Sequence, residues 1–266
     1  MFCLAALIPS PPVLVPELCG GAVPAGARAP IPAPPDAAAG PESAVAALRS
    51  AVLETGTALA EAASQWTVLG VGAAEGRYDA GTVGSFRGFG PEVTVSLGGP
   101  AEASGRPDPG LPLAVLIAGW LRGAVAPAAQ VRAQILAARS SGAHCAETGA
   151  KLRAELDAMD EPQAVLVVAD GAATLSTAAP GYLDPRAQGV QDELDRALAT
   201  GDRAALLAMD AGVCAELMLS GRVTYQALAG LFAADPEPPV VVERYRDAPF
   251  GVGYYAGSWR PGGPGR

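Results

Sequence analysis

The chain has 266 residues, of which 50% are apolar, and it carries a formal net charge of −9. This length suits one large α/β domain, with two small domains as the weaker alternative, and the apolar fraction is ample for a sizeable core. Because the chain is acidic and has no basic stripe, we expect neither nucleic acid nor an anionic membrane surface among its partners.

The first fifteen residues are apolar, but they do not have the pattern of a signal peptide. They lack a basic region, and Pro9, Pro11 and Pro12 interrupt the apolar run. Elsewhere no apolar stretch reaches the ~18 unbroken residues of a membrane helix. The four cysteines form no C-x-x-C pair, so we expect reduced thiols and a cytoplasmic location.

The expected elements alternate between strands and helices along the chain. Apolar runs and period-2 alternation predict strands at 2–8, 67–71, 93–97, 131–137, 164–169, 240–244 and 252–256. Apolar residues at helical spacing predict helices at 42–63, 111–123 and 144–159, with several more between 185 and 232. This order predicts a three-layer α/β/α fold in which helices cover both faces of one mixed or mostly parallel sheet.

Two segments of unusual composition limit this expected domain. Residues 22–41 are rich in Pro, Ala and Gly without periodicity, which predicts a loop insertion inside a single domain spanning 1–257. Residues 258–266 are rich in Gly and Pro, and we expect a flexible tail there. Asp184, Asp202 and Asp210 precede helical patterns and are expected helix N-caps.

Three features could carry chemistry. The glycine-rich run 70–76 follows a strand, but no clear helix follows it because 77–81 reads as loop, so a tight turn with close packing is favoured over a nucleotide cradle. Asp170 ends the clearest strand, and it is either a site carboxylate or a cap of the next turn. His144 is the only histidine, and its place before a helix favours a structural or surface role.

Segments at the start, middle and end of the chain resemble one known family. Residues 169–185 read ADGAATLSTAAPGYLDP, and counting from Asp170, Leu175 and Ala179-Pro180 fall in register with a Gly-Asp-Leu-Ser-His pattern and its following Ala-Pro. Residues 8–17 are similar to a His-Pro-Pro opening and 247–254 to a Glu-Ala-Pro-Phe closing stretch. The chain thus resembles the class III extradiol ring-cleavage dioxygenases (LigB-type), the superfamily of the protocatechuate 4,5-dioxygenase catalytic subunit.

The resemblance implies an Fe(II) site that this sequence does not complete. The family holds iron with two histidines and a carboxylate and uses a further histidine as acid/base, but the corresponding positions here are Ser10, Gly72 (or its neighbour) and Ala173. Only Asp247 keeps a carboxylate where the family has a glutamate. Because a facial triad needs two imidazoles and the chain has one histidine, we expect no iron, no metal site and no cofactor.

Several functional hypotheses follow from these departures. The favoured one is a bacterial branch that has lost oxygenase chemistry and binds a small molecule or a partner in the residual pocket, with Pro11, Tyr182 and Phe250 as walls by resemblance. An alternative is an enzyme that uses Asp170 and Asp247 for acid/base or Mg²⁺/Mn²⁺-assisted chemistry. An active extradiol dioxygenase is less favoured, a scaffold subunit stays open, and a homodimer is implied by resemblance alone.

Overall fold

A computed structural model of the protein describes residues 1–19 and 41–263. The expected loop at 22–41 therefore lies outside the described residues, except for residue 41. The last three residues of the expected tail, 264–266, also lie outside them. Among those described, none of the helices is both long and apolar enough to cross a lipid bilayer.

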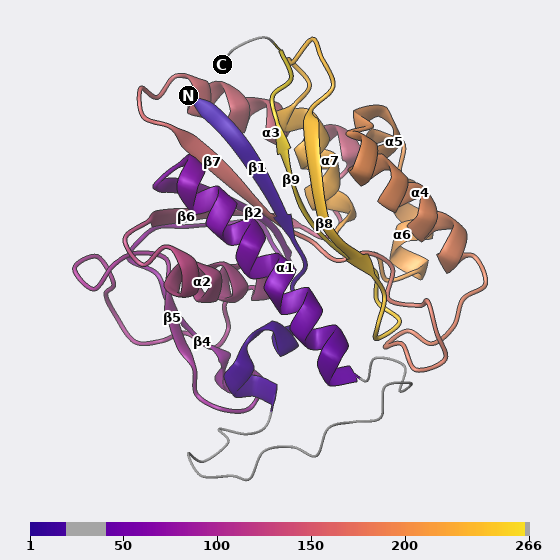
Figure 1. Cartoon of the computed structure of the whole chain (residues 1–266), viewed down its shortest axis with the longest axis horizontal. Coiled ribbons are helices and arrows are strands. Elements are labelled where there is room, and N and C mark those ends of the chain that lie inside the picture. The colour runs from indigo at the N-terminus through magenta and orange to yellow at the C-terminus, as the bar shows by residue number, and fades with distance from the viewer. Residues whose placement is uncertain (20–40, 264–266) are drawn as a thin grey trace.

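One sheet of seven strands runs through the centre of the molecule (Figure 1). Its spatial order is β3-β6-β2-β7-β1-β9-β8, in which β6, β2, β7 and β1 are parallel to one another. The strand β3 pairs antiparallel with β6 at one edge, and β9 and β8 add two antiparallel pairings at the other. The strands are β1 (Phe2–Ile8), β2 (Gln65–Gly72), β3 (Gly76–Tyr78), β6 (Gln130–Ala137), β7 (Gln163–Val168), β8 (Val240–Asp247) and β9 (Tyr254–Arg260). A separate pair is formed by β4 (Val83–Ser85) and β5 (Thr94–Ser96).

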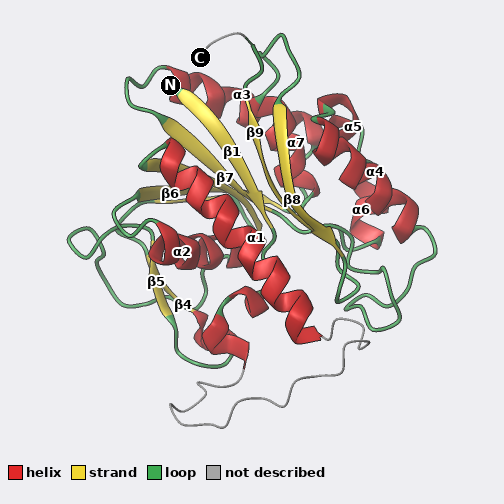
Figure 2. Ribbon diagram, in the orientation of Figure 1, coloured by secondary structure: helices red, strands yellow, loops and turns green. Residues whose placement is uncertain are grey.

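Helices cover both faces of this sheet, as Figure 2 shows. One face carries α1 (Pro41–Ala62) and α2 (Leu113–Val125). The other carries α3 (Gly142–Asp157), α4 (Ala187–Thr200), α5 (Arg203–Leu207), α6 (Ala211–Glu216) and α7 (Arg222–Leu231). Within β1, Leu4, Ala6 and Ile8 pack toward the first face and Ala5 and Leu7 toward the second. The expected three-layer α/β/α fold with a mostly parallel central sheet is confirmed.

The glycine-rich run after β2 serves packing. A Cβ atom on Gly70 would lie 2.4 Å from the Cβ of Ala114, and one on Gly72 would lie 2.8 Å from Ile135 Cγ2. These glycines let α2 and β6 approach β2 closely, so the expected close packing is confirmed. The expected loop at 77–81 is wrong in part, because β3 begins at Gly76 and pairs with β6.

The expected flexible tail at 258–266 is wrong for its first three residues. The strand β9 continues to Arg260, which pairs with Val240 of β8. Trp259 is fully buried, and its indole Nε1 donates to the Leu198 carbonyl at 2.9 Å. A large aromatic side chain with a satisfied N–H holds this segment in the core, despite the glycines and prolines that follow.

Caps at the helix starts confirm two of the three expected N-caps. The side chains of Asp202 and Asp210 accept hydrogen bonds from the backbone N–H groups three residues later. The expectation for Asp184 is wrong, because its carboxylate instead accepts from the backbone and guanidinium of Arg186 and α4 begins one residue after that arginine.

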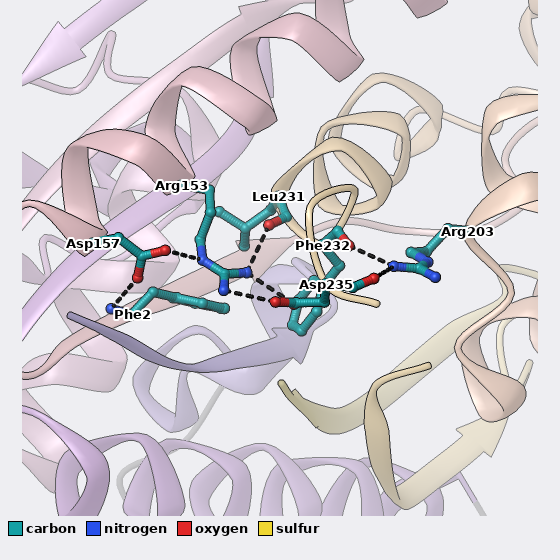
Figure 3. A network of polar contacts seen from close by, with 7 residues as sticks. All are labelled: Phe2, Arg153, Asp157, Arg203, Leu231, Phe232 and Asp235. Atoms are coloured by element: carbon teal, nitrogen blue, oxygen red, sulfur yellow. Dashed lines mark hydrogen bonds and ion pairs between the residues drawn. The ribbon is translucent and has the colours of Figure 1, made fainter. Parts of the chain in front are cut away.

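An arginine in the last turns of α3 connects this helix to the segment after α7 and to the start of β1 (Figure 3). Arg153 is 7% exposed and forms a two-pronged ion pair with Asp235, with N–O distances of 2.8 and 2.7 Å. Its Nε donates to Asp157 at 2.7 Å, and its guanidinium lies 5.0 Å from the centre of the Phe2 ring. This network fixes the ends of α3 and α7 against the start of β1.

Candidate functional site

The parallel strands β1 and β7 are neighbours, and the chain continues from their carboxyl ends to helices on opposite faces of the sheet. The loop after β1 leads to α1 on one face, and the loop after β7 leads to α4 on the other. In open α/β sheets a crevice for ligands forms at such a point, beyond the carboxyl ends of the strands. Ser10 and Asp170 follow these two strands.

The structure brings Ser10 and Asp170 into direct contact. The carboxylate of Asp170 accepts a hydrogen bond from the Ser10 backbone N–H at 2.8 Å and another from its hydroxyl at 2.5 Å. Asp170 therefore does not cap its own turn but ties the loop after β1 to the end of β7. Burial raises the pKa of the Asp170 carboxyl, and the two hydrogen bonds from Ser10 oppose that rise.

A buried glutamine fixes the loop that carries Asp170. The side-chain oxygen of Gln191 accepts the Ala172 N–H at 2.9 Å, and Cβ atoms on Gly171 or Gly253 would lie 2.2–2.3 Å from the Gln191 amide. The backbone N–H of Gly171 also donates to the Gly253 carbonyl at 2.8 Å. Sequence reasoning treated Gln191 only as part of a helix, although a glutamine on the apolar side of α4 was a signal of a buried polar role.

Apolar side chains lie around this polar pair. Ala173, Tyr254 and the partly buried Phe250 belong to the same core cluster as Ile8 at the end of β1, and Pro11 is also buried. The rings of Phe250 and Tyr254 meet edge to face at 6.4 Å between centres. Burial, and secondarily the charge of Asp170, raises the pKa of the Tyr254 hydroxyl, which keeps that phenol in its neutral form.

Among the described residues, three others of the expected site form no hydrogen bond with Ser10 or Asp170. Asp247 ends β8, is exposed, and accepts a hydrogen bond of 2.7 Å from the backbone of its own neighbour, Ala248. Gly72 lies against the side chains of Ile135 and Pro112. Tyr182 is 64% exposed and has a φ of 62°. Asp170 and Asp247 thus lie at the carboxyl ends of strands that run in the same direction, β7 and β8, but have separate hydrogen-bond partners.

The residues at the carboxyl ends of these strands do not fit the Fe(II) that the family resemblance implies. At the two positions where the resemblance places iron-binding imidazoles, Ser10 offers a hydroxyl that already donates to Asp170, and Gly72 offers no side chain. His144 lies at the start of α3, where its Nε2 is 2.8 Å from Glu75. Among the described residues no group of three or more His, Cys, Asp or Glu side chains is placed to hold a metal ion.

Comparisons with known proteins agree with the fold and leave the function open. No protein-family model and no curated protein matches the chain. Among solved structures, it is similar to the uncharacterized protein JW3007 from Escherichia coli K12, with a TM-score of 0.56 and 11% sequence identity. The match covers 96% of this chain and 99% of the other. At this identity the likeness shows the fold alone.

Proposed function

We propose that the protein is a member of the class III extradiol dioxygenase-like group that has lost oxygenase chemistry and binds a small molecule beside Ser10 and Asp170. The observation that carries the proposal is the contact of these two side chains beyond the carboxyl ends of β1 and β7. Both residues are partly exposed, so a ligand can reach them.

The chemistry of the pair selects the kind of ligand. Because the Ser10 hydroxyl donates to Asp170, the oxygen lone pairs that stay available on both side chains are hydrogen-bond acceptors. A ligand that bears hydroxyl or amino groups satisfies them, and the half-buried Phe250 supplies apolar surface for its carbon skeleton. We therefore propose a small hydroxylated or amino compound as the ligand.

An enzyme with replaced chemistry is the second candidate. The raised pKa of Asp170 is the observation that favours it, because a carboxyl group that stays protonated nearer to neutral pH can act as a general acid. In this candidate Asp247 is the second carboxylate, with or without Mg²⁺ or Mn²⁺. Asp247→Asn must then abolish turnover, whereas the binding proposal predicts that this variant behaves as the wild type.

The setting of the protein is also part of the proposal. All four cysteines are described and each is a free thiol, which supports a reducing cytoplasm. The net charge of −9 supports a function without nucleic acid or a membrane surface. A homodimer stays a proposal that rests on the family resemblance.

The first experiment measures metal content and ring cleavage. Protein purified without chelator and then loaded anaerobically with Fe(II) is expected to hold no stoichiometric iron and to give no yellow ring-opened product from catechol. Stoichiometric iron together with turnover would show an active dioxygenase and overturn the proposal.

The second experiment tests the ligand site. A panel of small hydroxylated and amino compounds is screened by thermal unfolding, and at least one is expected to raise the melting temperature of the wild type. Asp170→Asn should weaken that stabilisation. The matched variant Asp247→Asn changes an exposed carboxylate at the carboxyl end of β8 and should keep it. Equal responses of both variants would contradict the assignment.

A further inference from the structure

Two polar side chains of α4 connect a half-buried carboxylate to the loop after β7. Gln191 and Asp195 are about one helical turn apart, so they lie on the same side of the helix. The Gln191 Nε2 donates to Asp195 Oδ1 at 2.7 Å, and the Gln191 Oε1 accepts the Ala172 N–H at 2.9 Å. Because Gln191 is 4% exposed, its amide joins these two partners out of contact with bulk water.

The loop that Gln191 holds is also joined to the segment before β9. The Gly253 N–H donates to the Ala172 carbonyl at 2.9 Å, and the Gly171 N–H donates to the Gly253 carbonyl at 2.8 Å. The Gln191 amide lies so close to both glycines that a Cβ atom on either would come within 2.2–2.3 Å of it. Asp170 directly precedes this packed segment, so a shift of the Gln191 amide displaces the backbone that aims the Asp170 carboxylate.

The charge state of Asp195 sets the direction of the Gln191 amide. A carboxylate only accepts hydrogen bonds, so it requires the Gln191 Nε2 on its own side and leaves Oε1 for the Ala172 N–H. Its charge also polarises the amide and strengthens the bond to Ala172. A protonated Asp195 is a donor as well, and its hydroxyl competes with the Ala172 N–H for Oε1. Protonation therefore weakens the hold of Gln191 on the loop.

Asp195 faces β8, against which α4 packs (Figure 1). Burial raises the pKa of its carboxyl group to about 6, while the bond from Gln191 and the charge of Arg246 oppose that rise. Arg246 is shared with Glu243, whose Oε1 lies 3.6 Å from its Nε. The ionisable groups that face Asp195 come from α4, α7, β8 and β9, and they are Asp192, Tyr225, Glu243, Arg246 and Tyr255. Asp195 therefore changes its charge at a pH of about 6, where both buried phenols stay neutral.

We propose that Asp195 is a positioning residue that acts through Gln191 and makes the contact between Ser10 and Asp170 depend on pH. In its carboxylate form Asp195 fixes the loop after β7 with Asp170 aimed at Ser10, and on protonation this hold weakens. The inference rests on the binding function proposed for Ser10 and Asp170, because the position of this loop matters to a ligand only if that site binds one. A ligand of the site is then held more tightly when Asp195 is ionised.

Amide proton shifts of the ligand-free protein, followed by NMR across a pH range centred on about 6, test this coupling. The Asp195 carboxyl carbon gives the midpoint of its ionisation directly. The Ala172 N–H should move downfield with the same midpoint, because its bond to Gln191 strengthens. The Ser10 N–H, which donates to Asp170, should show a step at this midpoint in addition to the step caused by Asp170 itself.

Variants separate the bridge from a direct effect of the charge. Asp195→Asn should abolish this Ser10 step, whereas Glu193→Gln, which removes an exposed carboxylate of the same helix, should keep it. Gln191→Met removes both hydrogen bonds of the bridge, so the Asp195 carboxyl carbon should still titrate while the Ser10 step disappears. Circular dichroism and thermal unfolding confirm that each variant is folded. A Ser10 step that is absent from the wild type, or that persists in Asp195→Asn or Gln191→Met, would overturn the proposal.

The titration uses no ligand, so its result is independent of the thermal screen for ligands. If the screen finds no stabilising compound, the proposed binding function is wrong. If a compound binds beside Ser10 and Asp170 but the Ser10 step is missing, only the positioning role of Asp195 is wrong.

Discussion

The buried ion pair of Arg153 offers the sharpest test of how the elements are held together. Arg153→Met keeps the aliphatic stem but leaves Asp235, whose side chain is 9% exposed, without its cation. Removal of one partner of a buried ion pair costs about 3–5 kcal/mol, because the other charge stays buried and uncompensated. The variant also loses the bond to Asp157 and the contact with the Phe2 ring, so we expect the upper half of that range.

The matched control lies on the same helix. Lys151→Met also removes one positive charge, but the side chains of Lys151 and Glu147 are 69% and 61% exposed. Exposed pairs of this spacing contribute little to stability, because water and salt screen the attraction. Urea unfolding followed by circular dichroism gives the free energy of unfolding of both variants.

A double variant separates the two sources of the loss. Replacing both partners, as in Arg153→Met with Asp235→Leu, removes the uncompensated charge and should recover more than about 1 kcal/mol relative to Arg153→Met alone. If Arg153→Met costs no more than Lys151→Met, the ion pair of Figure 3 does not stabilise the fold and the argument is wrong.

Three further predictions concern acidity and the last strand. Burial raises the pKa of Asp195 to about 6, so the stability that its protonated form contributes is present below pH 3.8 and is lost as the pH rises through 6. In urea melts the unfolding free energy of the wild type should therefore fall relative to that of Asp195→Asn between pH 4 and 7. The pKa of Asp170 is raised in the same direction, so Asp170→Asn should likewise gain stability over the wild type as the pH rises, and an opposite slope would refute the burial argument. Trp259→Ala should lower the free energy of unfolding by about 3–5 kcal/mol in urea melts, because it empties a fully buried site.

The sequence by itself determined the layered fold and most of its elements. The continuous apolar run of β7 reflects burial on both faces of the sheet, and the helical spacing of α1 reflects burial on one side of the helix. Both patterns are written locally in the sequence. The caps at Asp202 and Asp210 were equally local, because an N-cap needs only the next three residues. The count of one histidine also sufficed to conflict with a two-histidine iron site, without any coordinates.

Tertiary structure alone decided which residues meet. Ser10 and Asp170 are 160 positions apart, and their contact depends on the pairing of β1 with β7, which no local pattern specifies. The same holds for Trp259, whose burial was hidden because glycine and proline around it favoured a tail. Local propensity fixes elements because its forces act over a few residues, whereas sites arise from strand order, which depends on packing across the whole sheet.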